Sequence, residues 1–361
     1  MPLGLPNARF FPGAQRVELL EEFEAAVQRR RETLGLGADA KLPGAEVIAI
    51  SGGGDNGAFG AGVLIGWTEA GDRPEFELVT GVSTGALLAP LIYLGPDYDQ
   101  QLREIYTTIT ADNIFEKRSF IDSLFNDALN DSSPLKDHIS KYFDESTMAA
   151  VAEEYRKGRL LLIATTDLDA QWPSIWNIGA IAASGDAGAL ELIRSLLCAS
   201  TAIPAFFPPV MIDVEVDGKK YQEMHVDGGA ISQIFLYPSN LDPDRIADEK
   251  RTAYLIFNAS AEPREANVDR RTMSIGGQAV ATMIHYGGKE DILRIYYTMR
   301  DDGIDYNLAY IGDDFVAVEH AEFDKAYMNA LFDYGYELAR NGYPWAKAPP
   351  FLTGTDDVEG E

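Results

Sequence analysis

The sequence predicts an α/β protein whose mainly parallel sheet is covered by helices on both faces. Two segments support this prediction, because each has a short apolar strand followed at once by a glycine turn and a helix. In the first segment, the strand 46–51 leads through three glycines into a helix at 57–70. In the second, the strand 76–80 leads through the turn 81–85 into a helix at 86–93. This alternation favours parallel pairing, since parallel strands need a crossover connection.

Further apolar runs extend this pattern along the chain. Three compact runs are expected to be buried strands, at 159–165, 210–216 and 252–258. Apolar residues at helical spacing predict further helices, at 190–199, 272–299 and 322–341. The chain is therefore expected to form a three-layer α/β/α structure, and the sequence contains no internal repeat or low-complexity linker that would divide it.

Both ends of the chain differ in composition from its centre. Residues 1–15 are rich in proline and glycine and are expected to be extended, whereas 17–34 have the spacing of an amphipathic helix. The tail from Thr353 is polar. The expected segments are an N-terminal arm and helix (1–45), a core (46–260) and a helical C-terminal extension packed on the core (261–361).

The composition is that of an acidic globular protein with a sizeable core. Of 361 residues, 46% are hydrophobic and 24% are charged. The chain carries 57 acidic and 30 basic residues, which gives a formal net charge of −27. This charge repels nucleic-acid phosphates and anionic membranes, so nucleic acid is not expected as a partner. A lipid partner would be held by apolar contact or through an uncharged or zwitterionic headgroup.

Cysteine and histidine are too sparse for a disulfide framework or a metal site. Cys198 is the single cysteine. The sequence contains neither an HExxH nor a CxxC motif. Its four histidines are scattered along the chain, at His138, His225, His285 and His320. No metal or other cofactor is therefore expected. No apolar run approaches the roughly 18 residues of a membrane-spanning helix, and the N-terminus lacks the regions of a signal peptide. Oligomeric state and cellular address stay open.

The turn at 81–85 contains a candidate nucleophile. Its sequence, Gly81-Val-Ser-Thr-Gly85, fits G-x-S-x-G and lies between an apolar strand and a helix. A sharp strand-to-helix turn exposes the serine, here Ser83, while the glycines leave room around it. The amide of Thr84 lies at the N-terminus of the following helix, where it favours developing negative charge. This context indicates nucleophilic catalysis by Ser83.

An earlier glycine turn, Gly52-Gly53-Gly54-Asp55-Asn56-Gly57, follows the first strand and opens a helix. Its amides could bind a phosphate group or the oxyanion of an acyl-transfer intermediate. The residues Gly52, Gly54 and Gly57 fit G-x-G-x-x-G, but the Lys-Ser/Thr pair of a Walker A loop is missing. The two glycine turns are expected side by side at the carboxyl edge of the sheet, so that one supplies oxyanion donors for the serine of the other.

The base that accepts the serine proton is either a histidine or an aspartate. None of the histidines lies in an evident triad order. His225 and Asp227 both occur in Met224-His-Val-Asp-Gly-Gly229, where strand alternation would place them on one face. Asp227 followed by two glycines is also a common turn. As a general base it needs a raised pKa or proton transfer coupled to attack, since a free aspartate is a poor base at neutral pH.

Four blocks occur in a fixed order between residues 46 and 230. They are the first glycine turn, G-x-S-x-G, the proline-bearing segment 199–209 and Asp-Gly-Gly at 227–229. This order resembles that of the patatin-like phospholipases, and the segments 165–169 and 176–180 are similar to bacterial members. The resemblance implies a three-layer α/β/α fold, a Ser-Asp dyad without histidine, no metal, and hydrolysis of acyl esters in lipids. It makes 46–260 the catalytic core, whereas the C-terminal extension resembles no family segment.

The resemblance also implies roles for individual residues. Transferred to this sequence, they are Ser83 as nucleophile, Asp227 as base, and the amides of Gly52, Gly53 and Gly54 as oxyanion donors beside that of Thr84. One departure concerns the headgroup. Many members carry a basic residue just before the last glycine of the first block, where this chain has Asp55 and Asn56. Loss of that positive charge argues against tight binding of an anionic headgroup and leaves the backbone donors unchanged.

The predicted function is lipid acyl hydrolysis through an acyl-serine intermediate, with transient contact to a membrane or micelle surface. Two alternatives stay open: transfer of the acyl group to an alcohol by the same dyad, and non-catalytic binding of a lipid or anion by the glycine turns. The segment 114–129 has apolar residues on one helical face. It is expected to pack on the core of the protein, with a lipid-contacting flap as the alternative. Acyl chain length, headgroup and positional preference are not predicted.

Overall fold

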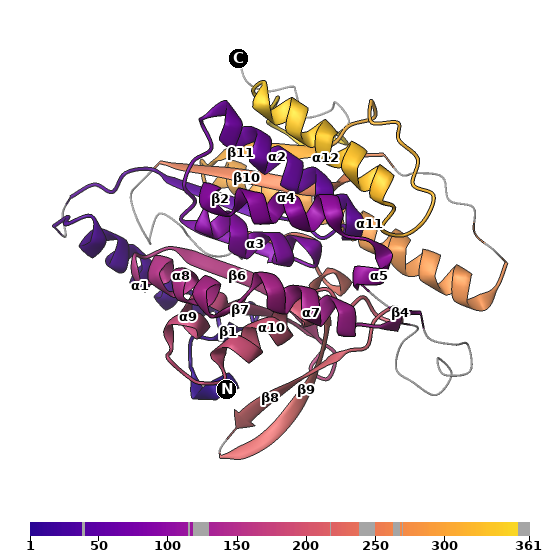
Figure 1. Cartoon of the computed structure of the whole chain (residues 1–361). Coiled ribbons are helices and arrows are strands. Elements are labelled where there is room, and N and C mark those ends of the chain that lie inside the picture. Colours follow the sequence, from indigo (N-terminus) through magenta and orange to yellow (C-terminus); the bar gives the residue numbers. More distant parts are fainter. Residues whose placement is uncertain are drawn as a thin grey trace.

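The computed structural model describes residues 1–37, 40–114, 116–117, 130–216, 218–237, 250–262, 268 and 270–352. Within these ranges a nine-stranded sheet forms the centre of the molecule (Figure 1). Its strands are β1 (Arg9–Phe10), β2 (Ala45–Ile50), β3 (Leu78–Val82), β6 (Leu160–Asp167), β7 (Trp172–Asn177), β8 (Val210–Val216), β9 (Lys219–Asp227), β10 (Arg251–Ser260) and β11 (Asp305–Ile311). A separate small sheet pairs β4 (Glu116–Lys117) with β5 (Asn130–Asp131).

Five strands form the parallel part of the sheet, in the order β6-β3-β2-β10-β11. In this register, Val47 of β2 lies opposite Leu78 of β3 and Ala253 of β10. At one edge β7 pairs antiparallel with β6, and β1 pairs antiparallel with β7. The strand β9 runs antiparallel to the last residues of β6 and forms a hairpin with β8, which projects from the body (Figure 1).

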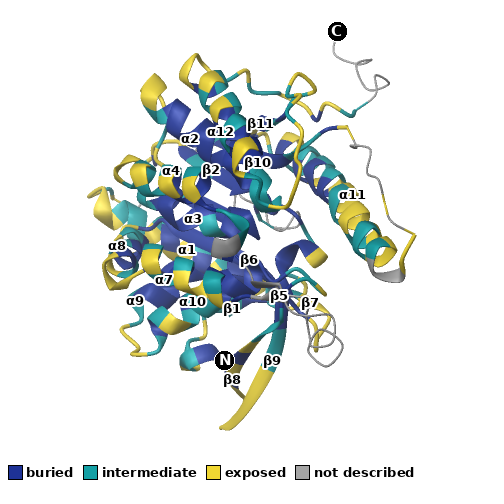
Figure 2. Ribbon diagram, turned by 45° about the vertical axis from the view of Figure 1, so that its right-hand side comes forward, coloured by how far each residue is buried: buried dark blue, intermediate teal, exposed yellow. Residues whose placement is uncertain are grey.

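Helices cover both faces of this sheet. They are α1 (Arg16–Thr33), α2 (Gly57–Ala70), α3 (Thr84–Leu94), α4 (Asp99–Thr108), α5 (Ala111–Ile114), α7 (Ser133–Tyr142), α8 (Glu145–Arg156), α9 (Ile178–Ala183), α10 (Ala189–Ser200), α11 (Thr272–Asp301) and α12 (Lys325–Arg340). Short 3-10 turns occur at Pro2–Gly4, Gly54–Asn56, Pro96–Tyr98 and Gly228–Ala230. The first half of α11 extends away from the sheet with much of its surface exposed (Figure 2).

Side-chain alternation along the buried strands creates a core on each face of the sheet. In β6, Leu161 and Ile163 pack in one hydrophobic cluster, whereas Leu160 and Leu162 pack in the other. The first cluster includes the buried sides of α2, α3, α10 and α12, and the second includes the second half of α11. Because successive strand residues face opposite sides, a strand buried on both sides is largely apolar, as Leu160–Ala164 of β6 are.

The predicted α/β class and the mainly parallel sheet between helical layers are confirmed. Two expectations are wrong in part. Residues 210–216 do form β8, but only Ile212 and Val214 of this strand are buried, because its pairing partner is the projecting strand β9. The C-terminal extension is not purely helical, because β11 pairs with β10 and completes the central sheet. Its helix α12 packs closely on α2, where Gly62 faces the backbone of Phe332.

Two segments of the sequence prediction fall mainly outside the described residues. Of 114–129, only Ile114 and β4 are described, and the tail from Thr353 is not described. Among the described helices, none combines the length and the apolar composition needed to cross a membrane.

Candidate active site

Ser83 lies at the sharp turn between β3 and α3. Its backbone has φ 55° and ψ −125°, a region that non-glycine residues rarely adopt. The turn brings α3 so close to β2 that a Cβ atom at Gly85 would overlap the carbonyl oxygen of Ile50. The Ser83 N–H donates to Ser200 Oγ at 3.0 Å, and this hydroxyl donates to the Ala164 carbonyl at 2.7 Å. Strand β6 and helix α10 therefore hold the strained turn in place.

Asp227 lies at the end of β9, beside Thr165 of β6. Its Oδ2 accepts a hydrogen bond from Ser83 Oγ at 2.6 Å, and its Oδ1 accepts one from the Gly229 N–H at 2.7 Å. Burial raises the pKa of Asp227 to about 7, although the hydrogen bonds from Ser83 and Gly229 act in the opposite direction. Asp227 is only 3% exposed. A carboxylate with this pKa is a far better proton acceptor than a free aspartate.

The first glycine turn lies beside Ser83, but its three amides are not equivalent. The Gly52 N–H donates to the Gln233 carbonyl at 3.0 Å, so the expectation that Gly52 also donates to an oxyanion is wrong in this structure. The N–H groups of Gly53 and Gly54 donate to no acceptor within the described part of the chain. The same holds for Thr84, whose amide begins α3. These three amides can stabilise negative charge near Ser83 Oγ.

Ser83 and Asp227 lie in the wall of a cavity of about 400 Å³. One part of the wall is apolar and combines residues of α11 with residues around the proline-bearing segment and β10; these are Ile203, Phe206, Phe207, Phe257, Val280, Ala281 and Ile284. Another part is acidic and contains Asp55, Glu319 and Glu322. The site therefore offers an apolar surface and a negatively charged surface to the same ligand.

Asp55 and Asn56, which replace the expected basic residue, tie the glycine turn to the C-terminal extension. Asp55 Oδ2 accepts from the Phe323 N–H at 3.1 Å, and Asn56 Oδ1 accepts from the Tyr327 hydroxyl at 2.7 Å. Burial raises the pKa of Asp55, which also shares a hydrogen bond with Glu319. At the position where a basic side chain was expected, this chain therefore has two polar side chains that are held in place by hydrogen bonds.

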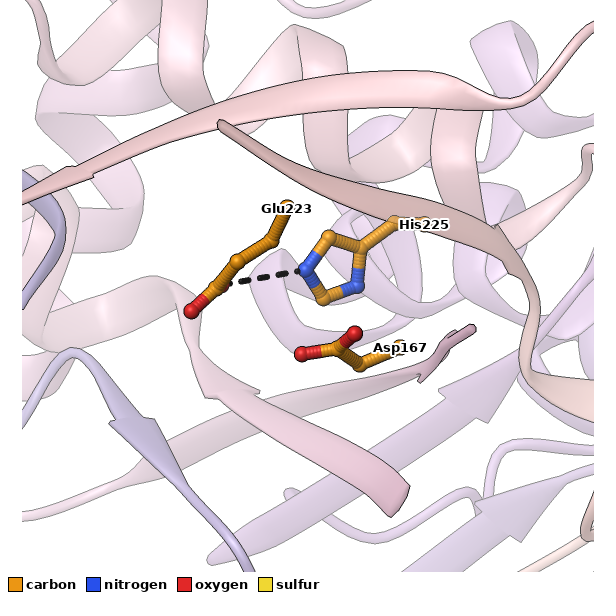
Figure 3. A group of neighbouring side chains, drawn as sticks. All are labelled: Asp167, Glu223 and His225. Atoms are coloured by element: carbon orange, nitrogen blue, oxygen red, sulfur yellow. Dashed lines mark hydrogen bonds and ion pairs between the residues drawn. The ribbon is translucent and has the colours of Figure 1, made fainter. Parts of the chain in front are cut away.

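His225, the alternative base, has partners other than Ser83 and Asp227. Its Nδ1 contacts Thr165 Oγ1 at 2.9 Å, and its Nε2 contacts Glu223 Oε2 at 3.4 Å (Figure 3). The Trp176 Nε1–H donates to Thr165 Oγ1 at 2.8 Å. The Thr165 hydroxyl therefore bridges Trp176 and the imidazole of His225. His225 therefore belongs to a hydrogen-bond network beside the site.

Asp167, Glu223 and His225 bring together ligand types that can hold a metal ion (Figure 3). Glu223, however, is ion-paired with Arg9, and hydrogen bonds from His225 and Arg9 outweigh its partial burial and lower its pKa to about 2. Asp167 Oδ1 accepts from the Ala170 N–H at 3.0 Å. The Arg9 guanidinium beside the cluster repels a cation. The three residues are therefore better explained as part of an ion-pair network than as a metal site.

Several residues of the cavity wall have no signal in the sequence. Gln233 follows Asp227 by six residues in a segment with no recognised motif. Ser200, which accepts from the Ser83 N–H, lies beside the wall in the proline-bearing segment and had no role of its own in the prediction. The wall residues of α11 come from the C-terminal extension, which resembles no family segment. Only the packing of distant elements around Ser83 identifies them.

The fold and the site define an α/β protein with a buried serine–aspartate pair in the wall of a partly apolar cavity. The chain belongs to the patatin-like phospholipase family. The model of that family matches residues 48–238, which is more than half of the chain and includes both Ser83 and Asp227.

Other comparisons give more distant similarities. VipD from Legionella pneumophila has 12% sequence identity and a TM-score of 0.42, over 82% of this chain and 66% of that one. Human GIVD cytosolic phospholipase A2 has 11% identity and a TM-score of 0.33, over 90% of this chain and 54% of that one. The chain thus spans about two thirds and about half of the lengths of these proteins. No curated protein matches the sequence.

Proposed function

We propose that this protein hydrolyses carboxylic esters of lipids, with Ser83 as nucleophile and Asp227 as the sole catalytic base. The observation that carries this proposal is the 2.6 Å hydrogen bond between Ser83 Oγ and a buried carboxyl group with a pKa of about 7. Membership of a phospholipase family supports lipid acyl hydrolysis as the class of reaction. A non-catalytic lipid binder would leave this serine–aspartate contact unexplained.

In the acylation step, Asp227 accepts the proton of Ser83 as Oγ attacks the ester carbonyl carbon. The oxyanion forms beside the amides of Gly53, Gly54 and Thr84, whose N–H groups donate to no other acceptor in the described part of the chain. The carbon–oxygen bond to the alcohol then breaks, and its electron pair stays on the leaving oxygen. Asp227 returns the proton to that oxygen, so a neutral alcohol departs and an acyl-serine remains.

In the deacylation step, water takes the place of the alcohol. Asp227 accepts a proton from water as the hydroxyl oxygen attacks the acyl carbon, and the second tetrahedral intermediate is held by the same amides. Collapse of this intermediate returns the proton to Ser83 Oγ and releases the fatty acid. An alcohol in place of water would give acyl transfer, so the products decide between the two reactions.

The cavity wall indicates which substrate fits. An acyl chain would lie against the apolar part formed by α11 and Phe206, where burial of each methylene contributes about 0.8 kcal/mol. The acidic part, with Asp55, Glu319 and Glu322, favours a zwitterionic or uncharged alcohol portion over an anionic one. On its outer side α11 exposes Ile275, Met283 and Tyr286. We propose that these exposed apolar side chains, on the same helix as part of the acyl-chain wall, contact the aggregated lipid substrate.

The test is hydrolysis of a p-nitrophenyl ester and of phosphatidylcholine by wild-type protein and three variants. Ser83→Ala should lower kcat/KM by at least about 10³-fold, as should Asp227→Asn. His225→Gln should cost far less, because His225 contacts neither residue of the pair. Ser195→Ala, on α10, controls for loss of a serine outside the cavity. A loss with His225→Gln as severe as that with Asp227→Asn would refute the two-residue mechanism.

Labelling and product analysis complete this test. A fluorophosphonate probe should label wild-type protein and the Ser195→Ala variant, and it should not label Ser83→Ala. Released fatty acid with wild type indicates hydrolysis, whereas a new ester formed in the presence of an added alcohol indicates acyl transfer. Unchanged labelling of Ser83→Ala would contradict the assigned nucleophile.

A further inference from the structure

Gln233 is a buried polar residue between the two glycine turns of the site, and it has no role in the mechanism described above. It is 8% exposed and lines the cavity together with Ser83 and Asp227. Its backbone is fixed on both sides, because its carbonyl accepts from the Gly52 N–H at 3.0 Å and its N–H donates to Asp291 Oδ2 at 2.7 Å. The start of the side chain is therefore as firmly placed as the glycine turn itself.

The carboxamide lies between the nucleophile side and the base side of the site. A Cβ atom at Gly52 would lie 2.5 Å from Gln233 Oε1 and 3.1 Å from Ser83 Cβ. A Cβ atom at Gly229 would overlap Gln233 Nε2 and lie 3.0 Å from Asp227 Oδ1. The absence of side chains at these two glycines thus opens the space that the carboxamide occupies, with Nε2 on the side of Asp227.

The side chain has no hydrogen-bond partner in the described part of the chain, although its backbone groups have two. Its polar atoms are not among the described side-chain atoms that are both unpaired and shut off from solvent, so the carboxamide is accessible from the cavity. A ligand that fills the cavity must therefore offer this amide a hydrogen-bond partner, because the amide would otherwise be withdrawn from water unpaired. The ligand must present a hydrogen-bond acceptor close to both Ser83 and Asp227.

In an ester bound for attack by Ser83, the oxygen that best fits this position is that of the leaving alcohol. The carbonyl oxygen faces the Gly53 and Gly54 amides, whereas the alcohol oxygen must lie near Asp227 to receive its proton. We infer that Gln233 Nε2 donates a hydrogen bond to the leaving alcohol oxygen and thereby assists its departure, an inference that rests on the proposed ester hydrolysis. As the carbon–oxygen bond breaks, the electron pair moves to this oxygen, which gains negative charge until Asp227 protonates it.

The experiment measures kcat/KM for two series of neutral esters with the same acyl group. One series has aryl leaving groups such as p-nitrophenol, which depart readily, and the other has alkyl alcohols, which need assistance. Gln233→Met keeps the length of the side chain and removes the amide. The variant should lose about tenfold or more on alkyl esters and less than about threefold on the p-nitrophenyl ester, so the dependence of rate on leaving-group pKa becomes steeper.

Gln278→Met, on α11 outside the cavity wall, is the matched control and should leave both series unchanged. Gln233→Met should also keep its melting midpoint and its labelling by a fluorophosphonate. An equal loss on both series, or a loss accompanied by a lower melting midpoint, would show that Gln233 only supports the glycine turns. No loss on either series would also overturn the inference.

Failure of this inference is separable from failure of the proposed function. If Ser83→Ala abolishes p-nitrophenyl ester hydrolysis while Gln233→Met affects both series equally, the hydrolase is supported and the leaving-group role is not. If Ser83→Ala retains activity, the hydrolase itself is refuted.

Discussion

If Asp227 is the only base for Ser83, its carboxyl group needs a pKa well above that of a free aspartate. In a histidine-containing triad the base titrates near neutral pH without help, whereas a free aspartate titrates near pH 4. Burial at the end of β9 provides the difference, since it disfavours the charged form and raises the pKa of Asp227 to about 7. The residue can therefore be ionised at pH 8 and still bind a proton during the reaction.

This pKa predicts the pH dependence of the reaction. Only ionised Asp227 can accept the Ser83 proton, so kcat/KM for an uncharged ester should rise about tenfold per pH unit below pH 7 and level off above it. The profile is measured from pH 5 to pH 9 with a substrate that does not titrate. A rate that stays constant down to pH 5 would contradict assignment of Asp227 as the base.

The same pKa predicts how stability depends on pH. Because the folded state binds the Asp227 proton more tightly than the unfolded state, the contribution of this group to stability falls as pH rises from about 4 to about 7. The loss is up to about 4 kcal/mol. Asp227→Asn should therefore have a higher free energy of unfolding than wild type at pH 8, and a similar one at pH 4. Urea unfolding at both values checks this, and a variant less stable at pH 8 would contradict it.

At the scale of elements, α11 links the C-terminal extension to the site. Its second half is buried against the sheet through Ile292 and Ile295, while its first half contributes Val280, Ala281 and Ile284 to the cavity wall. One helix thus combines an end packed on the sheet with an end that lines the cavity. The position of this wall relative to Ser83 would set the length of acyl chain that fits.

A larger side chain on this wall should shorten the acyl chains that are accepted. Ala281→Trp is expected to lower kcat/KM at least about tenfold for chains of twelve or more carbons and to leave acetyl and butyryl esters within about twofold. The control is Ala279→Trp on the same helix, which lies outside the cavity wall. A uniform loss across all chain lengths, or an equal effect of the control, would show that α11 does not bind the acyl chain.

At the scale of the whole molecule, the charge of −27 and the acidic part of the cavity act in the same direction. Long-range repulsion slows the approach to an anionic surface and is screened by salt, whereas the carboxylates in the cavity act at short range. The two effects can be separated, because only the first should vanish at high ionic strength.

Hydrolysis of phosphatidylcholine vesicles should therefore exceed that of phosphatidylglycerol vesicles by about tenfold or more at low salt. At 0.5 M salt the ratio of the two hydrolysis rates should become smaller. Glu322→Gln should reduce this ratio further. The control is Glu153→Gln, which removes the same charge at an exposed position outside the cavity wall and should reduce the ratio less. Equal rates on both lipids at low salt would contradict a preference set by charge.

Local sequence patterns predicted the larger part of the fold. The strand–glycine turn–helix units at β2 and β3 were recognisable because each depends on residues adjacent in the chain. The strand β11 and the pairing of β8 with β9 were not, since their positions depend on partners such as β10 and β6. The order of the strands, rather than their own composition, decides which of them is buried.

The sequence alone determined the α/β class and the candidate nucleophile Ser83, because periodicity and turn residues are local properties, and its resemblance to the family selected Asp227 as the candidate base. Only the tertiary structure brings these two side chains, 144 residues apart, within hydrogen-bond distance, and only it engages the Gly52 amide and leaves those of Gly53 and Gly54 open. It also places α11 and Gln233 in the cavity wall. The physical reason is that burial, pKa and hydrogen-bond partners depend on which distant segments the sheet brings together.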